Sequence, residues 1–138
     1  MAITGWVLDK SASVRANVPE VLRELKELTG SLFLCPMGEL EYLYAARSAR
    51  DYDELKSSLR AGINIISAPV DVFERALQLQ LDLAHHHGMW HRTAIGDLLI
   101  AETALYHEFG VVHVDGDFDR IAEVRPLRVR RLSTSSSK

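Results

Sequence analysis

The stretch AIGDLLIAETALYHEFGVVHVD, residues 94–115, contains the pattern that decides the fold. Its first part, 94–109, is apolar on nearly every side and long enough to predict a helix. Gly110 stands where a glycine commonly ends a helix. The following residues, 111–114, form a short apolar run that predicts a buried strand, and Asp115 comes directly after it. The stretch therefore predicts a helix and a strand, with an acidic residue at the carboxyl end of the strand.

The same alternation of helices with short apolar strands runs along the rest of the chain. Such strands predict an α/β fold in three layers, with a short, mainly parallel sheet flanked by helices. Strands are expected at 6–8, 32–35, 63–66 (or an extended linker there), 111–114 and, at or near an edge, 127–130. Helices are expected to start near Lys10, to run from Pro19 to Gly30, and to cover 37–48, 51–59, 69–87, 94–109 and 118–122.

The composition favours a single globular domain, expected over residues 1–132 with a flexible tail at 133–138. A chain of 138 residues with 47% hydrophobic and 25% charged residues can bury a core of its own. With a net charge of −3, the protein as a whole is not basic. Any nucleic acid would therefore have to bind through a local group of Lys and Arg side chains.

The lone cysteine, Cys35, favours a reducing compartment, because small secreted domains usually carry an even set of cysteines. We expect Cys35 in the core. No apolar run approaches the ~20 residues that span a membrane, and no signal peptide is visible. We therefore expect a cytoplasmic protein.

Four acidic residues stand where predicted strands or helices meet loops: Asp9, Glu41, Asp97 and Asp115. Carboxylates within apolar runs are costly to bury unless a positive charge neutralises them. Mg²⁺ or Mn²⁺, which prefer oxygen ligands, would do so. Asp9 and Asp115 each follow a predicted parallel strand, so they should meet at one sheet edge. Two of these acids also have a plainer interpretation: Asp97 as a helix-start residue, and Glu41 as a solvated residue like Glu39.

Two other metal sites are considered and set aside. Residues 115–119 alternate acids like a calcium loop, but Arg120 and Pro126 stand where that loop needs Gly and Glu. A turn with a helix cap is the favoured interpretation of Asp119. The histidines at 85–87 and 91 could suggest zinc, yet consecutive residues of a helix point in different directions, which favours a solvated helix end.

Four stretches together resemble the successive motifs of PIN-domain ribonucleases, and most closely the VapC-type toxins of bacterial toxin–antitoxin pairs. The resemblance covers almost the whole chain and implies a three-layer PIN-like fold. Two positions depart from the family pattern: Lys10, where Thr or Ser is common, and Gly96, where Pro is frequent. The stretches are Val7–Ala12, Leu40–Leu43, Gly96–Leu105 and His113–Ala122.

The resemblance implies a metal-dependent endoribonuclease with Mg²⁺ or Mn²⁺ as cofactor. A bound ion would activate a water molecule, and a pair of ions would sit ~4 Å apart. Carried over by position, the catalytic acids are Asp9, Glu41, Asp97 and Asp115. The metal ligands are Asp9, Asp97, Asp115 and Asp117, with Ser11 close to the metal.

The resemblance also implies partners. RNA would be the substrate, with weak candidate contacts at Ser11, Lys10, Arg15, Arg92 and Arg120. A small antitoxin would cover the site in a groove formed by the helices from Pro19 and Asp51, and a homodimer is expected. Two alternatives stay open: a non-catalytic PIN-like binding module, and a metal-dependent phosphatase. The phosphatase ranks lower because its Asp-x-Asp normally follows the first strand, where this chain has Asp9-Lys10-Ser11.

Overall fold

A five-stranded sheet in the order β3-β2-β1-β4-β5 lies at the centre of the computed structural model, which describes residues 4–86 and 90–133. Every pair of neighbouring strands is parallel. This confirms the predicted α/β class, and β5 is an edge strand as predicted. The strands are β1 (Trp6–Leu8), β2 (Leu32–Leu34), β3 (Asn64–Ile65), β4 (Gly110–His113) and β5 (Val129–Arg131).

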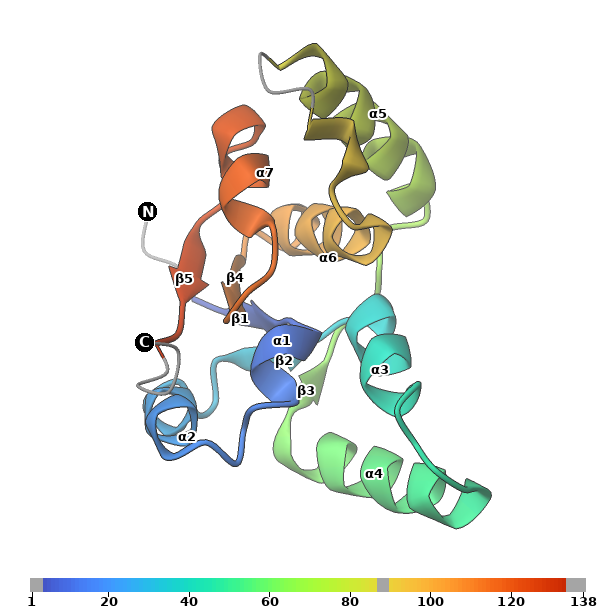
Figure 1. Ribbon diagram of the computed structural model, residues 1–138, viewed down its shortest axis with the longest axis vertical. Coiled ribbons are helices and arrows are strands. Elements are labelled where there is room, and N and C mark those ends of the chain that lie inside the picture. The colour runs from blue at the N-terminus through green and yellow to red at the C-terminus, as the bar shows by residue number, and fades with distance from the viewer. Residues whose placement is uncertain (1–3, 87–89, 134–138) are drawn as a thin grey trace.

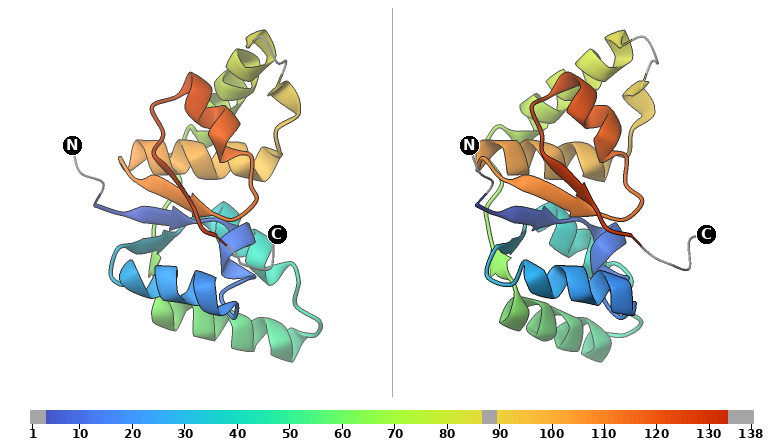
Figure 2. Two further views of the ribbon diagram at one scale, coloured as in Figure 1. Left: turned by 60° about the vertical axis from the view of Figure 1, so that its left-hand side comes forward. Right: turned by 90° about the vertical axis from the view of Figure 1, so that its left-hand side faces the viewer.

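Helices cover both faces of the sheet, which gives three layers. Helices α5, α6 and α7 lie on one face, and α2 and α4 lie on the other (Figures 1 and 2). Helices α1 and α3 directly follow β1 and β2 and contact each other. The bounds are α1 (Lys10–Ser13), α2 (Pro19–Glu27), α3 (Pro36–Leu43), α4 (Ala49–Gly62), α5 (Val72–His85), α6 (Ile95–Tyr106) and α7 (Phe118–Val124), with a 3₁₀ turn η1 at Trp90–Arg92.

The larger hydrophobic core lies between the sheet and helices α5, α6 and α7. Helix α6 is its centre, because every residue from 96 to 104 is buried. Ile100 of α6 and Leu79 of α5 are fully buried there, and Cys35 belongs to the same cluster, as expected. Burial of one such aliphatic side chain stabilises the fold by roughly 1.5–3 kcal/mol. The continuous apolar run of α6 is therefore explained by its central position.

Several predicted helix boundaries are wrong. Helix α3 ends at Leu43 and not near Ser48, because Ser48 is the N-cap of the next helix and its hydroxyl accepts a hydrogen bond from the Asp51 amide at 3.0 Å. Helix α4 accordingly starts at Ala49 and continues to Gly62, beyond the predicted 51–59.

Gly110 does not end α6 but begins β4. The helix stops at Tyr106, and Glu108 adopts the left-handed conformation with φ of 61°. Gly110 is needed for a different reason: a Cβ atom there would lie 2.6 Å from the Trp6 ring of the neighbouring strand. The glycine therefore allows close packing of β1 against β4.

Two predictions fall partly outside the described residues: the tail, beyond Ser133, and His87 of the histidine run. Within residues 4–86 and 90–133, no helix combines the length and the apolar character that a membrane crossing requires.

Candidate functional site

The carboxyl ends of β1 and β4, which are neighbours in the sheet, each lead into an acidic residue. Asp9 caps α1, and its Oδ2 accepts a hydrogen bond from the Ser11 amide at 3.0 Å. Asp115 lies in the loop that follows β4, with its side chain 59% exposed. Parallel pairing of β1 with β4 therefore puts both acids at one edge, as predicted.

Helices α3 and α6 bring Glu41 and Asp97 to the same place. All four acids border one cavity of about 380 Å³. The structure thus gathers side chains that are separated by up to about a hundred residues in the chain. The lining residues are Asp9, Lys10, Ser11, Val14, Arg15, Glu41, Ala94, Asp97, Asp115 and Gly116.

The environment of the cavity disfavours ionised carboxyl groups. Burial raises the pKa of Asp97 to about 7, and repulsion from Asp9, Asp117 and Glu41 acts in the same direction, against a hydrogen bond from the Asp117 amide. Burial also raises the pKa of Glu41, with a further contribution from Asp9 and a partial offset by Lys10. The positive charges of the protein are therefore not enough to stabilise the ionised forms of Asp97 and Glu41.

Gly96 makes room for the Glu41 carboxylate. A Cβ atom at position 96 would lie 2.6 Å from Oε2 of Glu41. Any other residue would push that carboxylate out of its position beside the first turn of α6. The sequence singled out Gly96 only as a departure from the family pattern, whereas the structure gives it a part in placing Glu41.

The Asp115 carboxylate forms an ion pair with Arg15. The Arg15 guanidinium donates to Oδ2 of Asp115 at 2.8 Å and to the Ser11 carbonyl at 2.7 Å. In the described residues, no group of three or more His, Cys, Asp or Glu side chains is already arranged to hold a metal ion. Like charges push carboxylates apart unless a cation holds them together. Asp115 would have to leave Arg15 before it could share a ligand set with Asp9 and Asp97.

The residues nevertheless fit a hard divalent cation. The donors are all carboxylate oxygens, the ligand type that Mg²⁺ and Mn²⁺ prefer. Oε1 of Glu41 is buried and has no hydrogen-bond partner among the described residues, and Asp97 is only 8% exposed. A buried acceptor without a donor is costly, and a cation in this cavity would satisfy it.

Several predicted site residues lie elsewhere. Asp117 does not line the cavity, although its amide donates to Oδ2 of Asp97 at 3.0 Å. Arg92 is outside the lining, and Arg120 lies over the Trp90 ring at 5.6 Å. Asp119, for which a helix cap was the favoured interpretation, lies in the first turn of α7 and pairs with Arg131 at 3.0 Å. Of the predicted RNA contacts, Ser11, Lys10 and Arg15 are the ones that border the cavity.

The sequence interpretation missed His113. Its ring is fully buried at the end of β4, and Nδ1 accepts a hydrogen bond from the Gly116 amide at 2.9 Å. Burial lowers the pKa of this imidazole, and Arg131 lowers it further. The one available signal was a histidine within an apolar strand, two residues before a candidate ligand.

Comparison with known proteins gives a consistent picture. A family model described as PIN domain matches residues 7–124. Ribonuclease VapC17 of Mycobacterium tuberculosis is 56% identical over 124 residues, which span 90% of this chain and 92% of that protein. Ribonuclease VapC21 of the same species is 37% identical over 123 residues, which span 88% of each.

Solved structures share the fold. A chain of the VapBC2 complex from Rickettsia felis, bound to a DNA fragment from its promoter, superposes with a TM-score of 0.75 at 17% identity and covers 93% of this chain and 98% of that one. A chain of VapBC-5 from Mycobacterium tuberculosis gives a TM-score of 0.66 at 20% identity, covering 94% and 99%.

Proposed function

The chain belongs to the PIN-domain family, and from this we propose that it is an endoribonuclease that acts as the toxin of a toxin–antitoxin pair. The observation that carries the proposal is the cavity at the carboxyl edge of the sheet, on which Asp9, Glu41, Asp97 and Asp115 converge. Relatives that cover most of the chain carry the name ribonuclease, and an acidic cavity suits cleavage of a phosphodiester better than binding of a polyanion without a metal.

The proposed cofactor is Mg²⁺ or Mn²⁺, held by Asp9, Asp97 and Asp115, with Asp117 as an additional acid. When bound, such an ion lowers the pKa of a coordinated water and polarises a phosphate oxygen. Hydrogen bonds from backbone amides already orient two of the ligands, since Ser11 donates to Asp9 and Asp117 donates to Asp97. Glu41, with its raised pKa and its unpartnered oxygen, is suited to hold a proton close to the reacting phosphate.

The substrate would approach between Lys10 and Arg15, the cationic residues that line the cavity. A phosphate backbone needs such charges beside an acidic centre, because the net charge of the chain is negative. Arg92 and Arg120, which do not line the cavity, would contact RNA only further along the strand.

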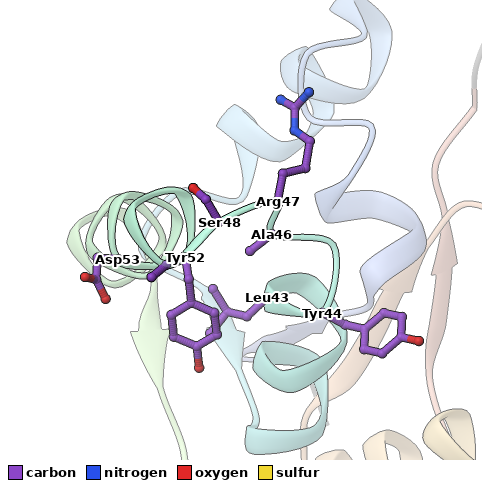
Figure 3. A pocket seen from close by; sticks show the side chains of 8 residues that line it. Leu43, Tyr44, Ala46, Arg47, Ser48, Tyr52 and Asp53 are labelled. Carbon is purple, nitrogen blue, oxygen red and sulfur yellow. The ribbon is translucent and has the colours of Figure 1, made fainter.

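The proposed antitoxin would bind across helices α2 and α4, as expected from the sequence. Helix α4 contains no buried residue although it is 14 residues long. A cavity of about 530 Å³ lies between its first turn and the end of α3, bordered by Leu43, Ala46 and Tyr52 (Figure 3). Leu22 of α2 is also exposed. A solved structure that shares the fold is named as a member of the VapBC family of toxin–antitoxin systems, so we assign this groove to an amphipathic segment of the antitoxin.

A homodimer is the proposed assembly, and helix α5 is its proposed contact surface. Phe73, Leu77 and Leu81 are 67%, 64% and 49% exposed and recur every four residues on one face. An apolar cavity of about 210 Å³ between α3 and α5 continues this surface at Leu40. Exposed apolar patches of this extent usually mark a protein interface.

Cleavage of a labelled RNA pool by the purified protein tests the proposal. We expect cleavage with Mg²⁺ or Mn²⁺, none with EDTA, and a loss to background in Asp97→Asn. The matched control is Asp119→Asn, because Asp119 lies outside the cavity and pairs with Arg131; it should cleave like the wild type.

Other outcomes would redirect the assignment. Asp97→Asn with undiminished cleavage would rule out this cavity as the centre. Metal binding without cleavage of any RNA would favour a binding module, and turnover of p-nitrophenyl phosphate would favour a phosphatase.

A further inference from the structure

The loop at 114–117, which follows β4 and carries Asp115 and Asp117, is held by three side-chain acceptors. The amide of Val114 donates to the Ser11 hydroxyl at 2.9 Å, that of Gly116 to Nδ1 of His113 at 2.9 Å, and that of Asp117 to Asp97 at 3.0 Å. Ser11 and Asp97 already belong to the proposed site. His113 is the third member of the set and has no other assigned role.

The His113 imidazole must be neutral in this arrangement. A backbone amide can only donate, so Nδ1 accepts and carries no proton, and the ring proton resides on Nε2. That Nε2 is buried and has no hydrogen-bond partner among the described residues. A buried donor without an acceptor costs roughly 1–3 kcal/mol. An apolar residue of similar size would therefore pack here at lower cost, so packing alone does not explain the histidine.

Neighbouring side chains leave the backbone at Gly116 little room for an alternative conformation. A Cβ atom on Gly116 would lie 2.7 Å from the Phe118 ring and 3.4 Å from Oδ2 of Asp9. The Gly116 backbone thus lies close to both a proposed ligand and a core ring. The Phe118 ring also meets the imidazole edge to face, with the ring centroids 5.2 Å apart.

We propose that His113 is a positioning residue of the site, which fixes the loop at 114–117 through the Gly116 amide so that Asp115 can reach a shared metal ion. The proposal rests on the proposed function for its metal. Without the acceptor, the Gly116 amide would be orphaned in a partly buried place, and the loop would move to satisfy it with water. Asp115, next to Gly116 and already half exposed, would move with it.

Two substitutions separate the hydrogen bond from packing. In His113→Asn, Oδ1 is bonded to Cγ just as Nδ1 is, so it can accept from an amide three residues on, as N-cap side chains do. In His113→Leu, the side chain fills the space but has no acceptor. We expect His113→Asn to lower the melting temperature, because the smaller side chain leaves a cavity in the core. We expect His113→Leu to keep or raise the melting temperature.

At the site itself we expect the opposite order, with His113→Leu more disruptive than His113→Asn. Backbone amide exchange at Gly116, measured by NMR on metal-free protein, should be at least about tenfold faster in His113→Leu and close to wild type in His113→Asn. Affinity for Mn²⁺, measured by electron paramagnetic resonance, should fall about 10- to 100-fold in His113→Leu, the range typical for outer-shell partners of ligands, and by less than about threefold in His113→Asn.

The outcomes distinguish this proposal from the proposed function. Equal Gly116 exchange in both variants and the wild type, or Mn²⁺ affinities that follow the melting temperatures, would overturn the role of His113. A wild-type protein that binds Mn²⁺ but cleaves no RNA would overturn the nuclease assignment and leave the His113 comparison intact. Failure of the wild type to bind Mn²⁺, with altered exchange in His113→Leu, would restrict His113 to a structural role and overturn the proposal.

Discussion

The Asp97 carboxyl group is buried among other acids, and its raised pKa follows from that position. Desolvation is the largest cause, and Asp9, Asp117 and Glu41 add repulsion. In an unfolded chain the same group would titrate near its ordinary value of 3.8. The folded, metal-free protein therefore holds a proton at Asp97 that the unfolded chain has lost, between about pH 4 and pH 7.

This difference predicts how the stability of the metal-free protein depends on pH. Because the folded pKa of Asp97 is the higher one, its contribution to stability is present below about pH 4 and is lost as pH rises through about 7. Asp97→Asn removes this loss, so the variant should exceed the wild type in free energy of unfolding at pH 8, by on the order of 2 kcal/mol. Urea unfolding in EDTA from pH 5 to 8 measures it. Parallel curves for the two proteins would contradict the assignment.

Arg15 provides a second prediction at the level of single residues. Its ion pair with Asp115 is partly exposed, at 37% and 59% of the two side chains, so it contributes at most about 1 kcal/mol. Arg15→Ala frees Asp115, and we expect Mn²⁺ to bind about two- to fivefold more tightly while RNA binds more weakly. Titration calorimetry with Mn²⁺ checks the first effect. Arg50→Ala, which removes an exposed pair with Glu54 on α4, should leave both affinities unchanged.

Helix α6 combines two tasks, since it forms the centre of the core and carries two buried acids. Asp97 faces the cavity, whereas Glu102, 5% exposed, faces Arg125 just after α7 at 3.3 Å. Arg125 also reaches Asp82 of α5 at 2.8 Å. Burial raises the pKa of Glu102, and Arg125 offsets part of that increase. The Arg125 guanidinium thus links α5 and α6 to the end of α7.

Removal of that guanidinium should destabilise the helical layer. Arg125→Met keeps the aliphatic stem but leaves the Glu102 carboxylate buried without its partner, and we expect a loss of about 2–4 kcal/mol in free energy of unfolding at pH 7. Adding Glu102→Leu should recover much of this loss, because no buried charge then remains. Urea denaturation of both variants provides the measurement. A double variant as unstable as Arg125→Met would mean that packing, and not charge, causes the loss.

At the scale of the whole molecule, the parallel sheet separates the proposed surfaces. The acidic cavity lies at the carboxyl edge. The proposed antitoxin groove lies between the end of α3 and the first turn of α4. Helices α4 and α5 cover opposite faces of the sheet (Figure 2). Separate surfaces would let a dimer form and still leave the antitoxin groove open.

The dimer proposal predicts a change in assembly when charge is placed on α5. The wild type should sediment at twice the monomer mass at micromolar concentration. Phe73→Asp and Leu77→Asp, both at exposed positions, should shift it to the monomer without loss of helical content, because a charge is costly to bury at an apolar interface. Glu54→Lys on α4 should remain dimeric. A wild type that sediments as a monomer would refute the assignment of this surface.

Local sequence was sufficient to predict the α/β class, the parallel sheet, the edge position of β5 and the acids that border the cavity. The reason is that hydrophobic periodicity and the position of a residue at a strand end are properties of short segments, and parallel pairing brings strand ends to one edge. Helix ends were predicted less well at Leu43 and Tyr106, where a Ser48 cap and the left-handed Glu108 decided the boundary.

Only the tertiary structure decided which groups meet. Arg15 and Asp115 are 100 residues apart in the chain, and nothing in either segment indicates the other. The need for Gly96 beside Glu41 and the hydrogen bond from the Asp117 amide to Asp97 likewise depend on distances set by how helices and loops pack on the sheet. The sequence by itself determined the kinds of groups at the cavity, because residue type is local, while their partners and protonation depend on packing, because burial and charge act through space.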